Sequence, residues 1–413
     1  MATEFMPRRR VVVTGMGMVS PLGVLSSEVW AQLKAQQNAV KVWEPLAHIN
    51  GMGTRLAAPV TATLPVYPRR QARSMGRIGM MAVWAAEQAL ADAELSGSPE
   101  LQNGRTGVAA GSCAGSAQAV AEEADFVHQK DVKCLNATTY AASMPHMVPV
   151  NLSLYFGLHG RLIPTSTACT SGAQGIGYAA EAIRFGLQDM MLAGGAEELS
   201  PLSIGVFDAL FADSTTEDPQ KAPRPVAKDR DGLVVGEGAG ILVLEELGHA
   251  QARGAHIYAE IVGFGTCSDA SHITSPNAKY MAESMRLALN DAGLAPSDIG
   301  YINAHGTATQ GGDLAEGQAM LEVFGDKVPV SSLKSYMGHT LGAAGALEAA
   351  MTILMQQHGW FSPNLNLETV DPNLAGLDLI VGAGRELEAK YVMSNNFAFG
   401  GVDTSLIFKK YEA

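Results

Sequence analysis

Three short segments of the sequence contain side chains that could form or break covalent bonds. They are STACTSG (residues 166–172), NAHGTATQGGD (303–313) and SLKSYMGHTLGAAGALE (332–348). The first contains Cys169, placed where a helix rich in small residues is expected to begin. A thiol at a helix N-terminus lies near unpaired N–H groups and the positive end of the helix dipole, which favour the nucleophilic thiolate. Taken alone, however, a buried cysteine is more often a small apolar core residue.

The other two segments contribute His305, His339, Lys334 and Glu348. Each has an ordinary structural explanation when taken alone, because a histidine after a strand often bonds the backbone and Lys and Glu commonly face solvent. Together they all fall at expected strand ends or helix starts, among small residues that leave backbone N–H groups available. Loops at the strand ends of α/β folds are where sites form, so we expect a shared site.

These residues do not match the sequence patterns of three common site types. No H-x-x-x-H or His/carboxylate spacing indicates a metal site, and no G-x-S-x-G segment indicates a serine hydrolase. The segment TGMGMVSPLG (14–23) lacks the third glycine of a dinucleotide site. We therefore interpret RRVVVTGMG (9–17) as a buried strand followed by a turn at its glycines. We therefore predict neither a metal site nor a nucleotide cofactor from these patterns.

Length and composition predict a large enzyme-like protein of the cytoplasm. A chain of 413 residues exceeds the size at which one hydrophobic core stops growing, so two halves are expected. The net charge of −13 argues against broad binding to nucleic acid or anionic membrane. Four widely spaced cysteines give no disulfide framework and fit a reducing compartment. The basic N-terminus lacks the apolar segment of a signal peptide, and no stretch reaches the roughly 18 apolar residues of a membrane span.

The sequence predicts an α/β protein in which one arrangement of strands and helices occurs twice. The segment RVVVTGMG (10–17) is echoed by YAEIVGFG (258–265), and TACTSGAQGIGYAAEAI (167–183) by YMGHTLGAAGALEAAMTI (336–353). The second pair predicts two helices rich in Gly and Ala, which can approach closely between two sheets. We therefore expect a duplicated five-layer α/β/α/β/α arrangement, with halves at residues 1–255 and 256–413.

At these residues the sequence resembles the elongating β-ketoacyl-(acyl carrier protein) synthases of bacterial fatty-acid and polyketide assembly. The resemblance covers essentially the whole chain. It rests on RRVVVTGMGMVSPLG, TACTSG, RPVAKDRDGLVVGEGAG, NAHGTATQGGD, KSYMGHTLGAAGALE and NNFAFGG, in that order. It implies the thiolase fold, which agrees with the two-half reading, and a decarboxylative condensation that extends an acyl chain by two carbons without a cofactor.

The resemblance also implies the roles of individual residues. Cys169 corresponds to the nucleophile that accepts the acyl chain as a thioester. His305 and His339 correspond to the histidines that act in malonyl decarboxylation, and Lys334 to the lysine of the same site.

Further residues are assigned in the same way. Asp313 and Glu348 correspond to supporting carboxylates. Phe399 corresponds to the gate aromatic, whose backbone N–H forms the oxyanion hole with that of the nucleophile. Thr307 and Thr309 correspond to threonines that line the phosphopantetheine tunnel.

Other functions within this superfamily are less consistent with the sequence. A non-catalytic chain-length partner would lack the nucleophile, but Cys169 is present. A coenzyme-A thiolase needs a second cysteine near the C-terminus, and no cysteine follows Cys267. Initiating condensing enzymes use Cys-His-Asn, whereas this chain offers two histidines.

The sequence departs from the family pattern around the gate. Ala398 replaces a glycine, Val402 and Asp403 stand where Thr-Asn is common, and Tyr336 and Met337 stand where Met-Thr is usual. Alanine disfavours positive φ, so we expect altered gate movement. These differences keep open an alternative, a dedicated polyketide or polyene pathway in place of primary fatty-acid synthesis.

The implied partner is the acidic acyl carrier protein, so a local basic patch is expected. The candidates are Arg69, Arg70, Arg73, Arg77, Lys130 and Lys133, of which Arg70, Arg73 and Arg77 would share one helical face. A solvated helix face is an equally good explanation of each arginine. The resemblance also implies a homodimer in which the segment 107–150 completes the partner's acyl pocket, and it leaves open a heterodimer with a related subunit.

Overall fold

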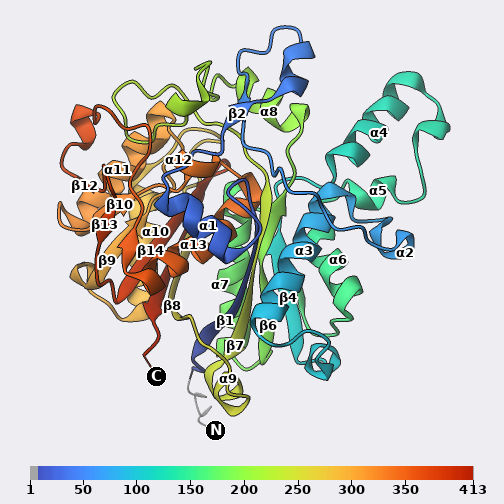
Figure 1. Cartoon of the computed structure of the whole chain (residues 1–413), viewed down its shortest axis with the longest axis horizontal. Helices are drawn as coiled ribbons and strands as arrows, with labels where there is room; N and C mark the ends of the chain where they lie inside the picture. Colours follow the sequence, from blue (N-terminus) through green and yellow to red (C-terminus); the bar gives the residue numbers. More distant parts are fainter. Residues whose placement is uncertain (1–7, 413) are drawn as a thin grey trace.

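The computed structural model describes residues 8–412. The segment 1–7, which is part of the N-terminus considered above for a signal peptide, lies outside the described residues. Its main element is an 11-stranded sheet in the order β12-β10-β9-β14-β15-β8-β1-β7-β6-β4-β5 (Figure 1). The strands are β1 (Val11–Val19), β4 (Thr106–Gly111), β5 (Leu162–Pro164), β6 (Met190–Glu197), β7 (Gly238–Glu246), β8 (Ala259–Ser268), β9 (Ile299–Asn303), β10 (Pro329–Ser331), β12 (Asp378–Leu379), β14 (Tyr391–Ala398) and β15 (Val402–Lys410).

The strand order repeats between the two halves of the chain. The first half has the order β1-β7-β6-β4-β5 and the second β8-β15-β14-β9-β10-β12. Without the short edge strand β12, the first, fifth, fourth, second and third strands follow one another in both halves. The halves meet where β1 pairs with β8 through Val12–Glu260 and Val13–Ala259. This repetition supports the predicted division at residue 255, which we retain as a proposal.

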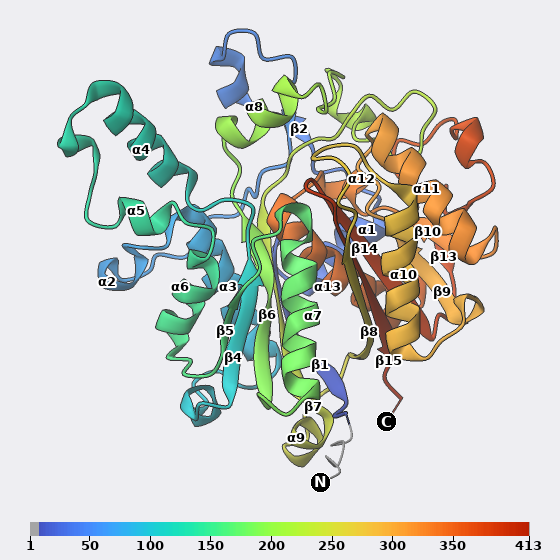
Figure 2. The same cartoon turned by 180° about the vertical axis from the view of Figure 1, so that it is seen from behind.

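Helices cover the sheet and separate its halves (Figures 1 and 2). Helices α3 and α6 cover the first half, α10 and α11 cover the second, and α7 and α13 form the central layer. Their bounds are α3 (Gly76–Asp92), α6 (Met147–Phe156), α7 (Ser171–Arg184), α10 (Ala278–Ala292), α11 (Gln310–Phe324) and α13 (Ala344–His358).

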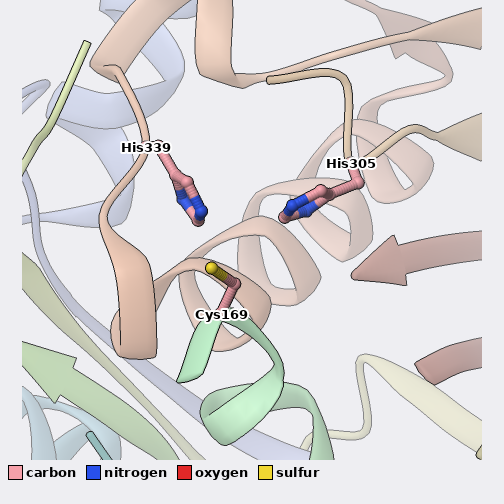
Figure 3. A group of neighbouring side chains, drawn as sticks. All are labelled: Cys169, His305 and His339. Atoms are coloured by element: carbon pink, nitrogen blue, oxygen red, sulfur yellow. The ribbon is translucent and has the colours of Figure 1, made fainter. Parts of the chain in front are cut away.

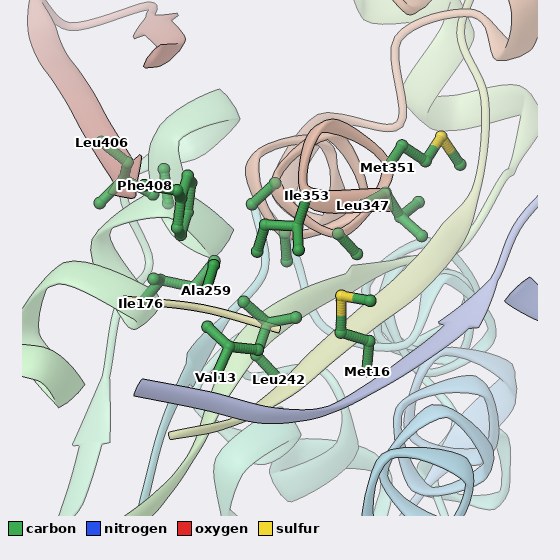
Figure 4. Packing of buried hydrophobic residues seen from close by; sticks show 14 of the residues in the cluster. Val13, Met16, Ile176, Leu242, Ala259, Leu347, Met351, Ile353, Leu406 and Phe408 are labelled. Carbon is green, nitrogen blue, oxygen red and sulfur yellow. The ribbon is translucent and has the colours of Figure 1, made fainter. Parts of the chain in front are cut away.

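The two central helices contact each other through small residues, as the sequence predicts. A Cβ added to Gly172 would lie 2.9 Å from the backbone nitrogen of Ala346, and one added to Gly345 would lie 2.6 Å from that of Ala173. This reciprocal contact lets the helices pack backbone to backbone. Figure 4 shows Leu347 and Met351 of α13 among core residues of neighbouring strands, such as Met16 on β1 and Leu242 on β7.

The glycines of the echoed strands have a packing role that corrects one expectation. We expected a turn after the first strand segment, but β1 continues through these glycines to Val19. A Cβ at Gly17 would lie 1.8 Å from the carbonyl oxygen of Ala85 in α3, and one at Gly265 would lie 2.1 Å from that of Ser284 in α10. Both glycines therefore allow a helix to lie directly on the strand.

Smaller elements complete the fold. They are α1 (Ser26–Lys34), α2 (Arg69–Ala72), α4 (Ala117–Gln129), α5 (Thr139–Ala142), α8 (Pro201–Ala209), α9 (Leu247–Ala252), α12 (Lys334–Met337), β2 (Lys41–Val42), β3 (Leu56–Ala57), β11 (Trp360–Phe361) and β13 (Arg385–Glu386). Helices α4 and α5 project from one side of the molecule (Figure 1). Across residues 8–412, no helix combines the length and apolar character that crossing a membrane requires.

Candidate active site

Cys169 lies in a tight turn, Ala168–Thr170, that leads directly into α7. The turn is held by side chains, because Thr170 Oγ1 donates to the carbonyl of Thr167 at 2.7 Å and Ser171 Oγ donates to that of Ala168 at 2.7 Å. Ala168 has φ +51°, in the left-handed region that costs a non-glycine residue energy. The hydroxyl groups of the segment thus hold a strained turn that presents the sulfur at the start of the central helix.

His305 lies in the loop that follows β9. Its backbone N–H and that of Gly306 donate to the two carboxylate oxygens of Glu316, both at 2.7 Å. Glu316 lies on α11 and is 2% exposed, so a buried carboxylate holds the backbone of this loop in place. Sequence reasoning did not identify Glu316, although it lies just beyond the quoted motif.

His339 follows α12 and is held in one tautomer. Its backbone N–H donates to the carbonyl of Val234 at 2.7 Å, and its Nδ1 accepts the N–H of Leu341 at 3.2 Å. A neutral imidazole that accepts at Nδ1 carries its proton on Nε2. This Nε2 is buried without a hydrogen-bond partner among the described residues, so an N–H donor is free to bind substrate.

The thiol and the two imidazoles converge, as Figure 3 shows. Their ligand atoms all lie within 4.8 Å of one another, and the ring centroids of His305 and His339 are 5.1 Å apart. Sequence spacing gave no sign of this donor set, which is of a kind that holds soft metal ions. The positive charge of Lys334 disfavours a bound cation at this position. Burial, and second to it this charge, hold the pKa of both histidines well below the ordinary value.

Lys334 and Glu348 form a buried ion pair behind the histidines. The ammonium lies 2.5 Å from Glu348 Oε1, and both side chains are fully buried. The other carboxylate oxygen accepts from Asn396 at 2.8 Å and from Asn303 at 3.5 Å. Burial raises the pKa of Glu348, and the ammonium opposes that rise. Neither asparagine was identified from sequence, although Asn396 lies in the quoted segment NNFAFGG.

The acidity of Cys169 differs from the expectation based on the helix dipole. Burial raises the pKa of its thiol to about 12, more than the charge of Lys334 lowers it. The carboxylate of Glu197, itself buried, raises the pKa further. Desolvation therefore outweighs the ammonium of Lys334 and the nearby backbone N–H groups, and the resting residue is a thiol that must give up its proton on reaction.

The gate loop, which we define as residues 397–401, places Phe399 next to the sulfur of Cys169. The backbone N–H groups of Phe399 and Cys169 both hydrogen-bond the sulfur in its anionic form, which lowers its pKa. The Phe399 ring lies 5.7 Å from that of Phe207 in α8. Gly400 has φ +89° and Gly401 φ +71°, whereas Ala398 ends β14 outside the left-handed region. The alanine is therefore accommodated without strain in this conformation.

A cavity of about 340 Å³ leads from the surface to Cys169. It is lined by both histidines and by Thr307 and Thr309, whose hydroxyl oxygens are 2.9 Å apart. Asp313 lies behind this wall and accepts the N–H groups of Val226 at 2.7 Å and Ala308 at 3.0 Å. Burial raises the pKa of Asp313 to about 6. The aspartate supports the cavity wall and does not line it.

The basic residues predicted for the partner surface divide into two groups. Arg69, Arg70, Arg73, Lys130 and Lys133 are exposed on or near α2 and α4, and none of them lines the cavity.

Arg77 differs from these residues because its guanidinium lies 2.7 Å from the buried carboxylate of Glu237, while 37% of its side chain stays exposed. Its place on the partner surface remains a prediction. The expected shared helical face is wrong, because α2 ends at Ala72 and α3 begins at Gly76, where φ is +60°.

Comparison with known proteins agrees with this geometry. Residues 8–250 match the model of the β-ketoacyl synthase N-terminal domain, and residues 258–368 match that of the C-terminal domain. A 3-oxoacyl-[acyl-carrier-protein] synthase 2 of Vibrio cholerae is 42% identical over 98% of this chain and 100% of its own length.

Solved structures show the same similarity. A β-ketoacyl synthase from Burkholderia phymatum superposes with a TM-score of 0.96 at 52% identity, covering 98% of this chain and 100% of the other. A type II polyketide ketosynthase, solved with its acyl-carrier protein and bound to the hexaketide, has a TM-score of 0.88 at 33% identity over the same shares. These matches confirm the predicted resemblance and thiolase fold: the chain belongs to the β-ketoacyl synthase family.

Proposed function

We propose that the chain is a 3-oxoacyl-(acyl carrier protein) synthase of the elongating type. The observation that carries the proposal is the convergence of Cys169 with two neutral imidazoles at the end of one cavity. Neutral imidazoles can donate N–H hydrogen bonds to an enolate, and a thiol can hold an acyl group as a thioester. No step of this chemistry requires a cofactor.

In the first half-reaction, Cys169 attacks the thioester carbonyl of the acyl carrier. A neutral imidazole accepts the thiol proton and passes it to the departing carrier thiol. The negative charge that develops on the carbonyl oxygen is stabilised by the N–H groups of Cys169 and Phe399, which already point to the sulfur. Each such donor contributes about 3 kcal/mol to the transition state.

In the second half-reaction, malonyl carrier loses CO2 and the electrons of the broken bond form an enolate. The free Nε2–H of His339 donates to the enolate oxygen, with His305 beside it. The enolate carbon attacks the acyl group on Cys169, and the sulfur leaves as a thiolate that takes up one proton from solvent. Burial, and second to it the charge of Lys334, keep both imidazoles neutral, and Glu348 balances that charge.

The partner we propose is an acyl carrier protein that docks at the cavity mouth. The related polyketide ketosynthase is described in complex with such a carrier. The rim of the mouth is apolar, with Leu210, Phe211 and Ile273 exposed. We include Arg70 and Arg73 in the docking surface as sources of positive charge, since both are exposed although neither lines the cavity.

We also propose that the protein is a homodimer that joins at the β5 edge, with 107–150 contributing to the partner's pocket. The short strand β5 ends the sheet and is unpaired on its outer side within the described chain. Exposed apolar side chains gather on the projecting segment beside it, among them Val127, Val132 and Tyr140. Such patches are typical of interfaces. Light scattering tests this proposal: a monomer at micromolar concentration would contradict it.

The reaction is tested by supplying acyl carrier and carboxyl-labelled malonyl carrier together. We expect labelled CO2 and a 3-oxoacyl carrier two carbons longer. His339→Ala should reduce CO2 release more than it reduces acylation of Cys169, because the lost donor serves the enolate. Product without CO2 release would indicate thiolase chemistry instead.

The acyl specificity stays open between fatty-acid synthesis and a dedicated polyketide or polyene pathway. Structures with ketosynthase and chain length factor paired also resemble this chain, one at 32% identity with a TM-score of 0.90. Competition between acyl carriers of different length and unsaturation distinguishes the two pathways. A strong preference for unsaturated or oxidised chains would favour the specialised one.

A further inference from the structure

Two buried aspartates lie on one face of the sheet beneath the gate loop. Asp403 on β15 is 3% exposed and Asp269, directly after β8, is 5% exposed, and both line the cavity that leads to Cys169. Asp403 pairs with Cys267, and the N–H of Asp269 donates to the carbonyl of Gly401 at 2.8 Å. Side chains two positions apart on paired strands share a face, so the two carboxyl groups are diagonal neighbours.

Asp269 holds the gate loop directly. Its Oδ1 lies 1.9 Å from where a Cβ on Gly401 would be, so the carboxylate occupies the side-chain space of that position. The same oxygen accepts the N–H of Ser271 at 2.9 Å. Gly400 in turn donates to the carbonyl of Ile273 at 2.8 Å. The gate loop and the loop after β8 are therefore tied together around one carboxylate.

Asp403 has no compensating contact for a negative charge. Its Oδ2 is buried and has no hydrogen-bond partner within residues 8–412, and the opposite residue on β14, Phe397, is apolar. Burial raises the pKa of Asp403 to about 7, with the charge of Asp269 adding to the rise. The other titratable side chains that line the cavity are Cys169, Asp231, His272, His305, Glu316 and His339. Cys267 lies on β8, and Lys279 and Glu283 lie at the start of α10.

We propose that Asp403 and Asp269 are positioning residues for the gate loop, and that they hold Phe399 against Cys169 only while one of the two carboxyl groups is protonated. With one proton, a neutral acid stands beside a single carboxylate. Without it, two like charges share a buried site, and their repulsion displaces the loop. The gate is therefore held below about pH 7 and released as the pH rises through that value.

Amide hydrogen exchange of residues 398–403 tests this proposal without substrate, so its result is independent of the proposed reaction. Wild type and Asp403→Asn are compared at each pH from about 6 to about 8.5, which cancels the intrinsic pH dependence of exchange. Asparagine keeps the shape of the neutral acid but cannot ionise. We expect the wild-type amides to lose about tenfold in protection relative to the variant across this range.

Two further variants make the comparison specific. Asp269→Asn should also flatten the pH dependence, because it removes the second charge of the pair. Asp213→Asn is the matched control: Asp213 is 4% exposed and its carboxylate is likewise unpartnered within the described chain, but it does not line the cavity. Asp213→Asn should follow wild type.

A kinetic readout separates positioning from a merely structural effect. The wild-type rate of Cys169 acylation, divided by that of Asp403→Asn, should fall about tenfold between pH 6 and 8.5. The proposal would be overturned if the ratio of the two acylation rates did not change with pH, and if amide exchange in wild type and in Asp403→Asn differed by the same factor at every pH. So would an Asp213→Asn protein that behaves like Asp403→Asn.

Discussion

Removing the charge of Glu348 should destabilise the protein strongly, because Lys334 would remain buried without a counter-charge. The two groups are 2.5 Å apart and fully buried. Losing one partner of such a pair costs about 3–5 kcal/mol of unfolding free energy. Gln at 348 keeps the hydrogen bonds from Asn396 and Asn303, so the loss in Glu348→Gln is the loss of the charge.

The double variant Lys334→Met/Glu348→Gln separates stability from catalysis. Without the unpaired ammonium it should recover to within about 1 kcal/mol of wild type, since buried pairs are often replaceable by apolar groups. It should still release little CO2, because the imidazoles lose the charge that helps keep them neutral.

Urea unfolding followed by circular dichroism measures the stabilities, and CO2 release from malonyl carrier measures the reaction. A single variant within 1 kcal/mol of wild type would refute the reasoning on stability. A double variant with wild-type decarboxylation would refute the electrostatic role of Lys334.

Three further predictions follow from the geometry. Because burial raises the pKa of Cys169 to about 12, its alkylation by iodoacetamide, followed by peptide mass spectrometry, should rise about tenfold per pH unit from pH 7 to 9; a plateau would contradict this acidity. Gly17→Ala should cost about 1–3 kcal/mol in urea unfolding, since the new Cβ meets a helix backbone; an unchanged midpoint would contradict the close contact. Reversing the charge of Arg70 and Arg73 together should raise KM for carrier-bound substrate several-fold and weaken its salt dependence; an unchanged KM would remove both from the docking surface.

The fold was predictable where sequence pattern and packing have the same cause. The echoed helix segments predicted the close central pair, because Gly and Ala at positions such as Gly172 and Gly345 serve that contact. The glycines of β1 were misread as a turn. Glycine marks both turns and close helix–strand contacts, and only the position of α3 distinguishes them.

The sequence predicted which chemical groups form the site, but not how burial and neighbouring charges set the pKa values of those groups. Cys169 and the histidines stand at recognisable strand ends and helix starts. The balance of burial against the helix dipole depends on how deeply the thiol lies, which no local pattern records. Glu316 and Glu197 were missed for the same reason, since a carboxylate that binds backbone N–H groups leaves no spacing signature.

Arg77 shows the limit of helical spacing as an argument. Its distance from Arg73 fits one helix face, but the helix is interrupted between α2 and α3, and the guanidinium pairs with the buried carboxylate of Glu237. The sequence neighbours alone do not reveal this partner, because it lies 160 residues away.

The most direct test of the account is to identify the residue that carries the acyl group. Wild-type protein is mixed with acyl carrier alone, then digested and analysed by mass spectrometry. The account predicts a single acyl adduct on Cys169, absent from a folded Cys169→Ala protein that also makes no 3-oxoacyl product. An adduct on another residue, or condensation that survives in Cys169→Ala, would contradict it.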